Sequence, residues 1–177
     1  MRWRLGATVG AGVAAVWLQD LRITSLGVVG VDHFLAYLPW APAALAVLAV
    51  AGLPHAFNLI DGYNGLASTV AMACCLALAY VAWQVGDRQL AAVVLVLAGA
   101  TAGFLVWNYP RGLLFTGDGG AYLWGVVIAV ASIQLVQRHP EVSPWFPMLM
   151  LSYPVGETVF STYRKLARGQ SPGRADA

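Results

Sequence analysis

The chain has little charge for its length. Charged residues make up 10% of its 177 residues, whereas soluble domains carry about 25%, and hydrophobic residues make up 59%. This deficit excludes a soluble globular domain and indicates an integral membrane protein. The apolar segments are hydrophobic on all sides over lengths that suit membrane-spanning helices, without the period of two that barrel strands show. We therefore predict an all-α, polytopic transmembrane helical bundle.

Cysteine is also scarce, and the basic residues are few and dispersed. The two cysteines, Cys74 and Cys75, are adjacent within an apolar run, which argues against a disulfide framework and favours small buried hydrophobes. The basic residues lie at the ends of apolar segments and form no patch, so no nucleic-acid partner is expected. No small-x-small cleavage site follows the first apolar stretch, so no cleavable signal peptide is expected.

Six apolar segments are expected to form a bundle of five or six helices in a single integral-membrane domain over residues 1–177. The region 19–40 is predicted to be a loop with a short interfacial stretch at 31–38. Residues 164–177 are predicted to form a mobile cytoplasmic tail. The six segments cover residues 5–18, 41–60, 66–85, 90–107, 121–136 and 145–163.

Basic residues set the predicted orientation. Alternation through six spans places both chain ends and the loops after residues 60 and 107 on one side of the membrane. Three basic residues, Arg22, Arg88 and Arg138, fall on the opposite side. By the positive-inside rule, the first side is cytoplasmic. Its seven basic residues are Arg2, Arg4, Arg111, Arg164, Lys165, Arg168 and Arg174.

Two polar clusters interrupt the apolar pattern, and both are predicted to face the cytoplasm. The first places Asp61 between the amides Asn58 and Asn64, and the second places Asp118 among glycines. A carboxylate near hydrocarbon costs about 2.5–3.5 kcal/mol on insertion scales, so its default interpretation is functional. Carboxylate oxygens suit Mg²⁺, and a glycine-flanked helix start suits a phosphate. The pattern favours metal-assisted phosphoryl transfer on a nucleotide-type substrate, with an acceptor from the bilayer.

Two other interpretations of these clusters remain open at the level of sequence. Asp61 and Asp118 are also suited to be helix N-caps, with the neighbouring glycines as turn formers. A small transporter would also carry intramembrane carboxylates. Its broken helices, however, are expected near the bilayer midplane and not in glycine turns on one face.

Two sequence boxes carry a resemblance to a known family. Residues 58–67 match the pattern Asn-x-x-Asp-Gly-x-(Asp/Asn)-Gly-Leu-Ala, and residues 108–120 match Asn-(Tyr/Phe)-Pro-x-x-x-x-Phe-x-Gly-Asp-x-Gly. The chain therefore resembles the polyprenyl-phosphate N-acetylhexosamine-1-phosphate transferases, or glycosyltransferase family 4, which include the enzyme that makes lipid I. The family's C-terminal Arg-x-x-x-Gly-x-Ser-Pro pattern is matched only loosely, at Arg164, Gly169, Ser171 and Pro172.

The resemblance implies a reaction at the cytoplasmic face of a bacterial inner membrane. A UDP-N-acetylhexosamine would donate its sugar 1-phosphate to undecaprenyl phosphate in the bilayer and release UMP. The reaction would require Mg²⁺, with Mn²⁺ as a possible substitute. Such reactions serve the synthesis of cell walls and of lipopolysaccharide O-antigens.

The resemblance also implies roles for individual residues. Asp118 and Asp61 would hold the metal, and Asn58 would join them in the catalytic cleft. Phe115 would stack on the uracil ring, and Asn108 would contact the nucleoside. Together, the substrate-binding residues implied by motif position are Asn64, Asn108, Phe115, Gly117 and Gly119.

The chain also departs from the family pattern. Members carry an acidic pair before the helix equivalent to residues 5–18 and a histidine-rich loop after the Ser-Pro stretch, and neither occurs in this sequence. The alternative expectation is therefore a catalytically inactive, truncated remnant or a non-enzymatic membrane subunit. A homodimer, or a separate chain that supplies the missing N-terminal half, is the expected protein partner.

Three further polar residues are informative. His55 stands where many members have asparagine, on the helical face of Asn58. It either reaches the substrate cleft or is a neutral histidine whose hydrogen bonds are made to neighbouring helices. Glu157, inside the last apolar segment, either reaches the cleft or pairs with Arg164 or Lys165. Asn64, where other members have aspartate, favours N-acetylglucosamine-type donors over the peptidoglycan precursor.

Overall fold

The computed structural model describes residues 2–168, which form eight α-helices and no strand. This confirms the predicted all-α architecture. Helices α3 to α6 are long and apolar enough to cross a membrane, and α1 adds a shorter apolar stretch at Leu5–Gln19. The helices are α1 (Arg2–Gln19), α2 (Val29–Tyr37), α3 (Ala41–Ile60), α4 (Leu66–Gln84), α5 (Arg88–Asn108), α6 (Gly117–Arg138), α7 (Trp145–Met150) and α8 (Ser152–Ala167).

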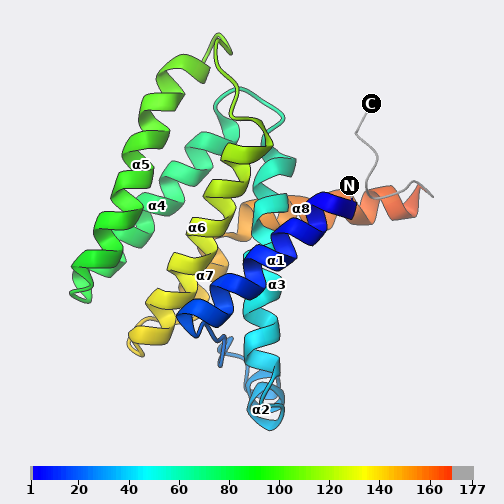
Figure 1. The fold of residues 1–177 in the computed structure, drawn as a ribbon, viewed down its shortest axis with the longest axis vertical. Helices are drawn as coiled ribbons and strands as arrows, with labels where there is room; N and C mark the ends of the chain where they lie inside the picture. Colours follow the sequence, from blue (N-terminus) through cyan, green and yellow to red (C-terminus); the bar gives the residue numbers. More distant parts are fainter. Residues whose placement is uncertain (1, 169–177) are drawn as a thin grey trace.

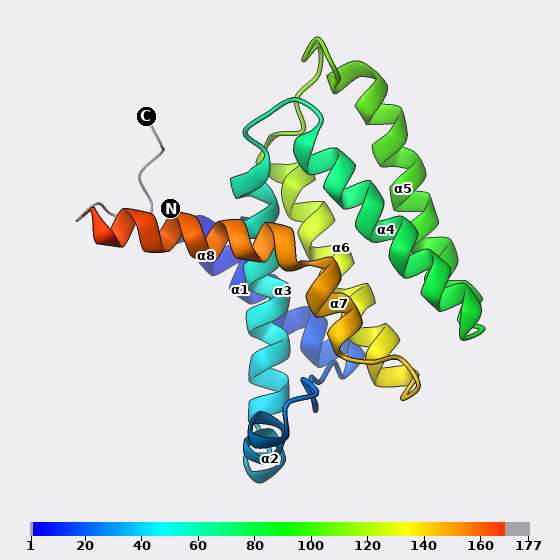
Figure 2. The same cartoon turned by 180° about the vertical axis from the view of Figure 1, so that it is seen from behind.

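Helices α3 and α6 pack against each other at the centre of the bundle. Helices α1 and α8 pack on opposite faces of α3, and α4 packs against α5 and α6 (Figures 1 and 2). Phe57, Leu78 and Ile128 are fully buried in the core between these helices. The α3–α4 and α5–α6 loops lie at one end of the bundle, and α2 lies at the other (Figure 1). The fold therefore brings both polar clusters to the same end.

Helices α3 and α6 approach to backbone contact at Gly125. A Cβ atom at this position would collide with the backbone of Pro54 and Leu53. Small residues allow membrane helices to pack this closely, and the close packing is a main source of their association energy. The contact holds the ends of α3 and α6, which carry the two polar clusters, at short range.

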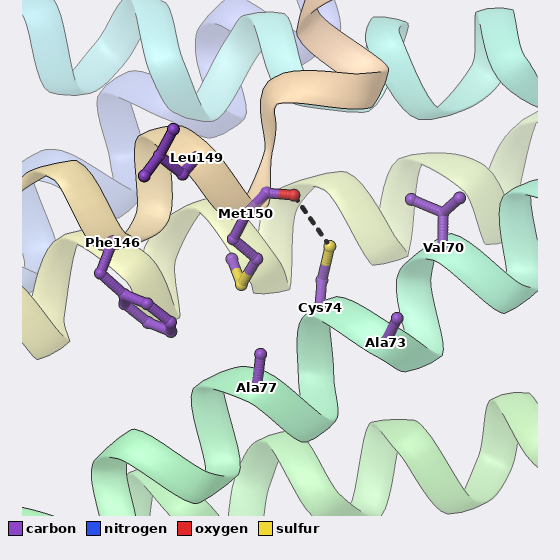
Figure 3. A pocket seen from close by; sticks show the side chains of 7 residues that line it. All are labelled: Val70, Ala73, Cys74, Ala77, Phe146, Leu149 and Met150. Carbon is purple, nitrogen blue, oxygen red and sulfur yellow. Dashed lines mark hydrogen bonds between the residues drawn. The ribbon is translucent and has the colours of Figure 1, made fainter.

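Eight helices form where five or six were predicted, partly because the last apolar segment is broken. The predicted segment 145–163 divides at Leu151 into α7 and α8. Pro154 has no N–H, and its ring excludes the carbonyl four residues earlier, that of Met150. The Met150 carbonyl instead accepts a hydrogen bond from Cys74 Sγ at 3.8 Å (Figure 3). The other additional helix is α2, which covers most of the stretch predicted to be interfacial.

Two smaller predictions can also be compared with the fold. Helix α8 continues to Ala167, and Lys165 is buried, so residues 164–167 of the predicted mobile tail are helical; the mobility of the tail stays a prediction. The rest of that predicted tail, 169–177, lies outside the described residues. Both cysteines are buried and free, which confirms that they act as small core residues.

Candidate functional site

The two motif loops are joined by the side chain of Asn108. This residue ends α5 and is buried, with 5% of its surface exposed. Its Oδ1 accepts a hydrogen bond from the Gly65 backbone N–H at 2.6 Å, and its Nδ2 donates to the Leu114 carbonyl at 2.8 Å. Asn108 therefore holds the loop of the first box against the loop of the second.

Two glycines with left-handed backbone allow these loops to interlock. Gly65 has φ +83°, and a Cβ there would lie 2.9 Å from the ring of Tyr109. Gly112 has φ +61°, and a Cβ there would lie 2.7 Å from Asn64 Nδ2. The amide of Asn64 also donates to the Pro110 carbonyl at 3.5 Å. A side chain at either glycine would force the loops apart. Both positions therefore require glycine, for its backbone conformation and for its small size.

A small cavity of about 60 Å³ lies where the loops meet. Two exposed aromatic rings, Tyr63 and Phe115, stand at it with 79% and 74% of their surfaces accessible. Thr116 also lines it, and its Oγ1 is buried with no hydrogen-bond partner in the described part of the chain. The cavity thus combines exposed aromatic faces with polar side chains. Its lining residues are Asp61, Gly62, Tyr63, Asn64, Asn108, Phe115 and Thr116.

Asp118 lies beside this cavity in the first turn of α6. Asn58, in the last turn of α3, donates a hydrogen bond from Nδ2 to Asp118 Oδ1 at 2.9 Å. A carboxylate in the first turn of a helix interacts favourably with the helix dipole, and the same N-terminus offers free N–H groups to an anion. The pair therefore fixes a carboxylate oxygen at a position suited to bind the cationic counter-ion of a phosphate.

Asp61 occupies a less favourable electrostatic environment. It is the C-cap of α3 and is partly buried, and burial raises the pKa of its carboxyl group. The C-terminus of a helix also disfavours a negative charge. Both burial and the helix dipole therefore oppose ionisation of this carboxylate, and a cation bound there would offset them.

The alternative in which both aspartates are N-caps is wrong. Gly65 is the N-cap of α4 and Thr116 is the N-cap of α6. Asp61 instead ends α3, and Asp118 is the second residue of α6. Neither carboxylate is therefore needed to begin the helix that follows it.

The donor set at this end of the bundle fits Mg²⁺. Asp61, Thr116 and Asp118 offer carboxylate and hydroxyl oxygens, which hard cations prefer. Within residues 2–168, no three His, Cys, Asp or Glu side chains cluster as a metal site. Mg²⁺ does not require such a cage, because it is usually held by one or two carboxylates together with substrate phosphates and waters.

The structure distributes the predicted site residues over two adjoining groups. Asp61, Asn64, Asn108 and Phe115 line the cavity, while Asn58 and Asp118 form the hydrogen-bonded pair. Gly117 and Gly119 flank Asp118 at the start of α6. Glu157 is exposed on α8 and does not line the cavity. The roles predicted for these residues remain predictions.

Sequence reasoning missed Tyr63 and Thr116, both of which line the cavity. Each lies inside a motif box, at a position that the pattern leaves unspecified. Their proximity to motif residues was therefore the only available signal. The larger cavity, about 420 Å³, holds no motif residue and is an apolar groove between α4 and α7 (Figure 3). It is lined by Val70, Ala73, Cys74, Ala77, Phe146, Leu149 and Met150.

The chain is similar to several known transferases. The chain is 30% identical over 134 residues to a probable undecaprenyl-phosphate N-acetylglucosaminyl 1-phosphate transferase of Bacillus subtilis, covering 75% of this chain and 37% of that protein. It is 27% identical over 177 residues to the undecaprenyl-phosphate alpha-N-acetylglucosaminyl 1-phosphate transferase of Thermotoga maritima, covering 99% and 51%. It is 34% identical over 124 residues to the phospho-N-acetylmuramoyl-pentapeptide-transferase of Moorella thermoacetica, covering 70% and 38%.

These alignments show that the chain spans about half, or less, of the length of the curated relatives it matches. The model of the glycosyl transferase family 4 matches residues 1–136, which include both motif boxes and every residue that lines the small cavity between the motif loops. The chain belongs to glycosyl transferase family 4.

Proposed function

We propose that the protein transfers N-acetylhexosamine 1-phosphate from a UDP-sugar to undecaprenyl phosphate and releases UMP. The observation that carries this proposal is the meeting of the two motif loops at one end of a membrane bundle. There the Asn58–Asp118 pair, at the start of α6, adjoins a cavity with exposed aromatic rings. A soluble nucleotide-sugar can reach this end from water, and a lipid phosphate can reach it from the bilayer.

The cavity supports binding of the nucleoside part of the donor. Phe115 exposes its ring and can stack on a uracil base, and such stacking contributes about 1–3 kcal/mol per base. Asn64 is exposed beside it and offers amide groups to the base edge. The buried hydroxyl of Thr116 is a further donor toward the same space.

The start of α6 supports binding of the diphosphate. The acceptor phosphate is already anionic near neutral pH, so the main obstacle to reaction is repulsion between two anions. A bound Mg²⁺ would supply the positive charge that offsets this repulsion. The chain's own part is to orient the Asp118 carboxylate through Asn58, to place Asp61 nearby, and to present the N–H groups of the first turn of α6.

Orientation and donor class complete the proposal. Both motif loops lie at one end of the bundle, and the positive-inside pattern predicts that this end is cytoplasmic; this supports a reaction at the inner face of a bacterial inner membrane. Asn64 supports UDP-N-acetylglucosamine as the donor to test first. Two of the relatives described above carry N-acetylglucosaminyl 1-phosphate transferase in their names.

The test is UMP release by membranes in which the protein is expressed from its complete reading frame. UDP-N-acetylglucosamine, undecaprenyl phosphate and Mg²⁺ are supplied, and labelled lipid product is counted in parallel. We expect release that needs both substrates, is lost with EDTA, returns with Mg²⁺ or Mn²⁺, and is abolished by Asp118→Asn. Thr101→Val, a buried change between α5 and α6, is the matched control and should retain activity.

The same assay distinguishes the alternative. If release does not exceed that of membranes without the protein, and no partner chain restores it, the proposal is wrong. The protein would then be a non-enzymatic membrane subunit or an inactive remnant.

A further inference from the structure

His55 is a point of contact between three helices, one turn below the Asn58–Asp118 pair. It lies on α3, three residues before Asn58 and on the same helical face. Its Nε2 lies 3.0 Å from Thr8 Oγ1 on α1. Its ring meets the ring of Tyr122 on α6 edge to face, with centroids 5.3 Å apart and planes inclined by 67°.

The hydrogen bonds of Thr8 determine which nitrogen of His55 carries a proton. Thr8 is buried, and its hydroxyl donates its single hydrogen to the Leu5 carbonyl at 3.0 Å. With its hydrogen directed to the Leu5 carbonyl, the hydroxyl oxygen accepts from His55, and we infer that Nε2 carries a proton. The His55–Thr8 contact is therefore a directional bond that sets both the tautomer and the orientation of the ring.

The contacts of α3 with α6 form three successive levels along these antiparallel helices. Asn58 meets Asp118, His55 meets Tyr122, and Pro54 meets the backbone of Gly125. His55 forms the middle level. Any rotation or slide of α3 against α6 that separates Asn58 from Asp118 must also disturb the His55–Tyr122 contact.

Helix α1 also packs on α3 at this level. Below the Thr8–His55 bond, the backbone of Gly12 approaches α3 so closely that a Cβ there would lie 3.2 Å from the Val47 carbonyl oxygen. The Thr8 and Gly12 contacts are one helical turn apart on α1, so α1 is held in a defined register on α3. The side chain of His55 thus transmits the placement of α1 to the pair at the start of α6.

We propose that His55 is a positioning residue that keeps Asn58 in hydrogen-bond register with Asp118. This inference rests on the proposed transferase function, in which the Asp118 carboxylate acts on the donor diphosphate. His55 itself does not line the cavity, so it acts through Asn58 and Asp118. Its loss should therefore lower kcat and leave the KM for the UDP-sugar nearly unchanged, because the base-binding cavity is formed by other residues.

Thr8→Val is the sharpest variant, because it removes the hydroxyl, keeps the shape and leaves His55 in place. Thr101 offers a matched control in the same bundle. Its hydroxyl donates to the Leu97 carbonyl at 2.7 Å and accepts from Trp124 Nε1 at 2.9 Å. Thr8 and Thr101 are thus both buried, both bonded within their own helix, and both acceptors for a ring N–H from another helix.

The experiment compares kcat, KM and thermal stability for Thr8→Val, Thr8→Ser and Thr101→Val in the protein expressed from its complete reading frame. We expect Thr8→Val to lower kcat by about ten-fold to a hundred-fold, as misplacements near an ångström do. Thr8→Ser keeps the hydroxyl and should restore kcat to within about two-fold. Thr101→Val should lose similar stability but keep kcat within about two-fold of the wild type.

A second readout does not depend on activity. The sequence has three histidines, His33, His55 and His139. In ¹⁵N NMR of histidine-labelled protein, replacing one histidine at a time identifies the ring-nitrogen signals of His55. We expect a protonated, exchange-protected Nε2 at His55 in the wild type and in Thr8→Ser. In Thr8→Val this protection should be lost.

Each outcome decides the proposal. If the wild type is active and Thr8→Val has the same kcat as Thr101→Val, the positioning role is wrong. The proposed transferase function then stands. A His55 ring protonated only at Nδ1 overturns it as well. A wild type without UMP release, even with a protected His55 Nε2–H, overturns the transferase function and this inference together.

Discussion

Asn58 and Asp118 lie 60 positions apart in the sequence, yet the Asn58 amide donates a hydrogen bond to the Asp118 carboxylate at 2.9 Å. The bond joins the last turn of α3 to the first turn of α6. Each helix contributes one member, so the bond forms only when the two helices pack in a single register. The pair therefore reports directly on whether the site is assembled.

Asn58→Ala should lower kcat on the order of a hundred-fold, because the Asp118 carboxylate loses the group that orients it. If the two residues act as a unit, the double variant Asn58→Ala/Asp118→Asn should be no slower than Asp118→Asn alone. Steady-state UMP release measures both. Multiplicative losses in the double variant would show that the two residues act independently.

Asn108→Ala should destabilise the protein by about 1–3 kcal/mol, because it leaves the Gly65 N–H and the Leu114 carbonyl without their buried partner. Thermal unfolding in detergent measures this loss. Asn64→Ala, in the same pair of loops but exposed, should change stability by less than about 0.5 kcal/mol. Equal losses in the two variants would contradict the role assigned to Asn108 in joining the loops.

Gly125→Ala should destabilise the bundle by about 1–3 kcal/mol and lower kcat as well, since the new methyl group meets the backbone of Pro54 and forces α3 away from α6. Gly99→Ala is the control, because a Cβ there meets open space in the interior of α5. It should be neutral or stabilising by up to about 1 kcal/mol. A Gly125→Ala protein with unchanged stability and rate would contradict the close approach of these helices.

Phe115→Ala should raise the KM for the UDP-sugar about ten-fold or more, with kcat within about two-fold, if its ring stacks on the base. The ring is 74% exposed, so thermal stability should not change. Phe34→Ala removes another exposed ring, on α2 at the opposite end of the bundle, and should leave both constants unchanged. A rise in KM for both variants would indicate a general effect on the membrane protein rather than base stacking.

Asp87, at the end of the bundle opposite the motif loops, should make stability depend on pH. Burial by itself raises the pKa of its carboxyl group. This effect is outweighed by hydrogen bonds from the Leu90 N–H and His139 and by the charge of Arg138, so the pKa lies below its ordinary value. The charged form is therefore favoured in the folded state. The resulting stability is present above about pH 3.9, the unfolded value, and is lost as the pH falls through the folded value.

Asp87→Asn separates this charge from the helix cap. The amide can still accept from the Leu90 N–H, as Asp87 Oδ1 does at 2.9 Å, but it loses the attraction to Arg138. We expect Asp87→Asn to be less stable than the wild type at neutral pH and to approach it as the pH falls through the lowered folded pKa of Asp87. Asp87→Ala should lose about 1 kcal/mol more at every pH, because the N-cap is gone. Parallel stability curves for wild type and Asp87→Asn would contradict the effect of charge.

Local patterns accounted for much of the fold. The predicted segments 41–60 and 66–85 agree with α3 and α4 to within a residue, because each is a long, mainly apolar run, the first ending at Asp61 and the second lying between Gly65 and Gly86. The break at Leu151 was missed, although Pro154 supplied its cause. A proline near a helix start is tolerated when it lies in the first turn, so its effect depends on where the helix begins.

The sequence by itself determined that this is a helical membrane protein, and it placed Asn58, Asp61 and Asp118 among the candidate site residues, because composition and motif spacing are local properties of the chain. Only the tertiary structure decided that Asn108 joins the two loops and that His55 bonds Thr8. An amide or an imidazole can satisfy its hydrogen bonds in many ways. Its partner is selected by which distant segments the packing of α1, α3 and α6 brings within about 3 Å.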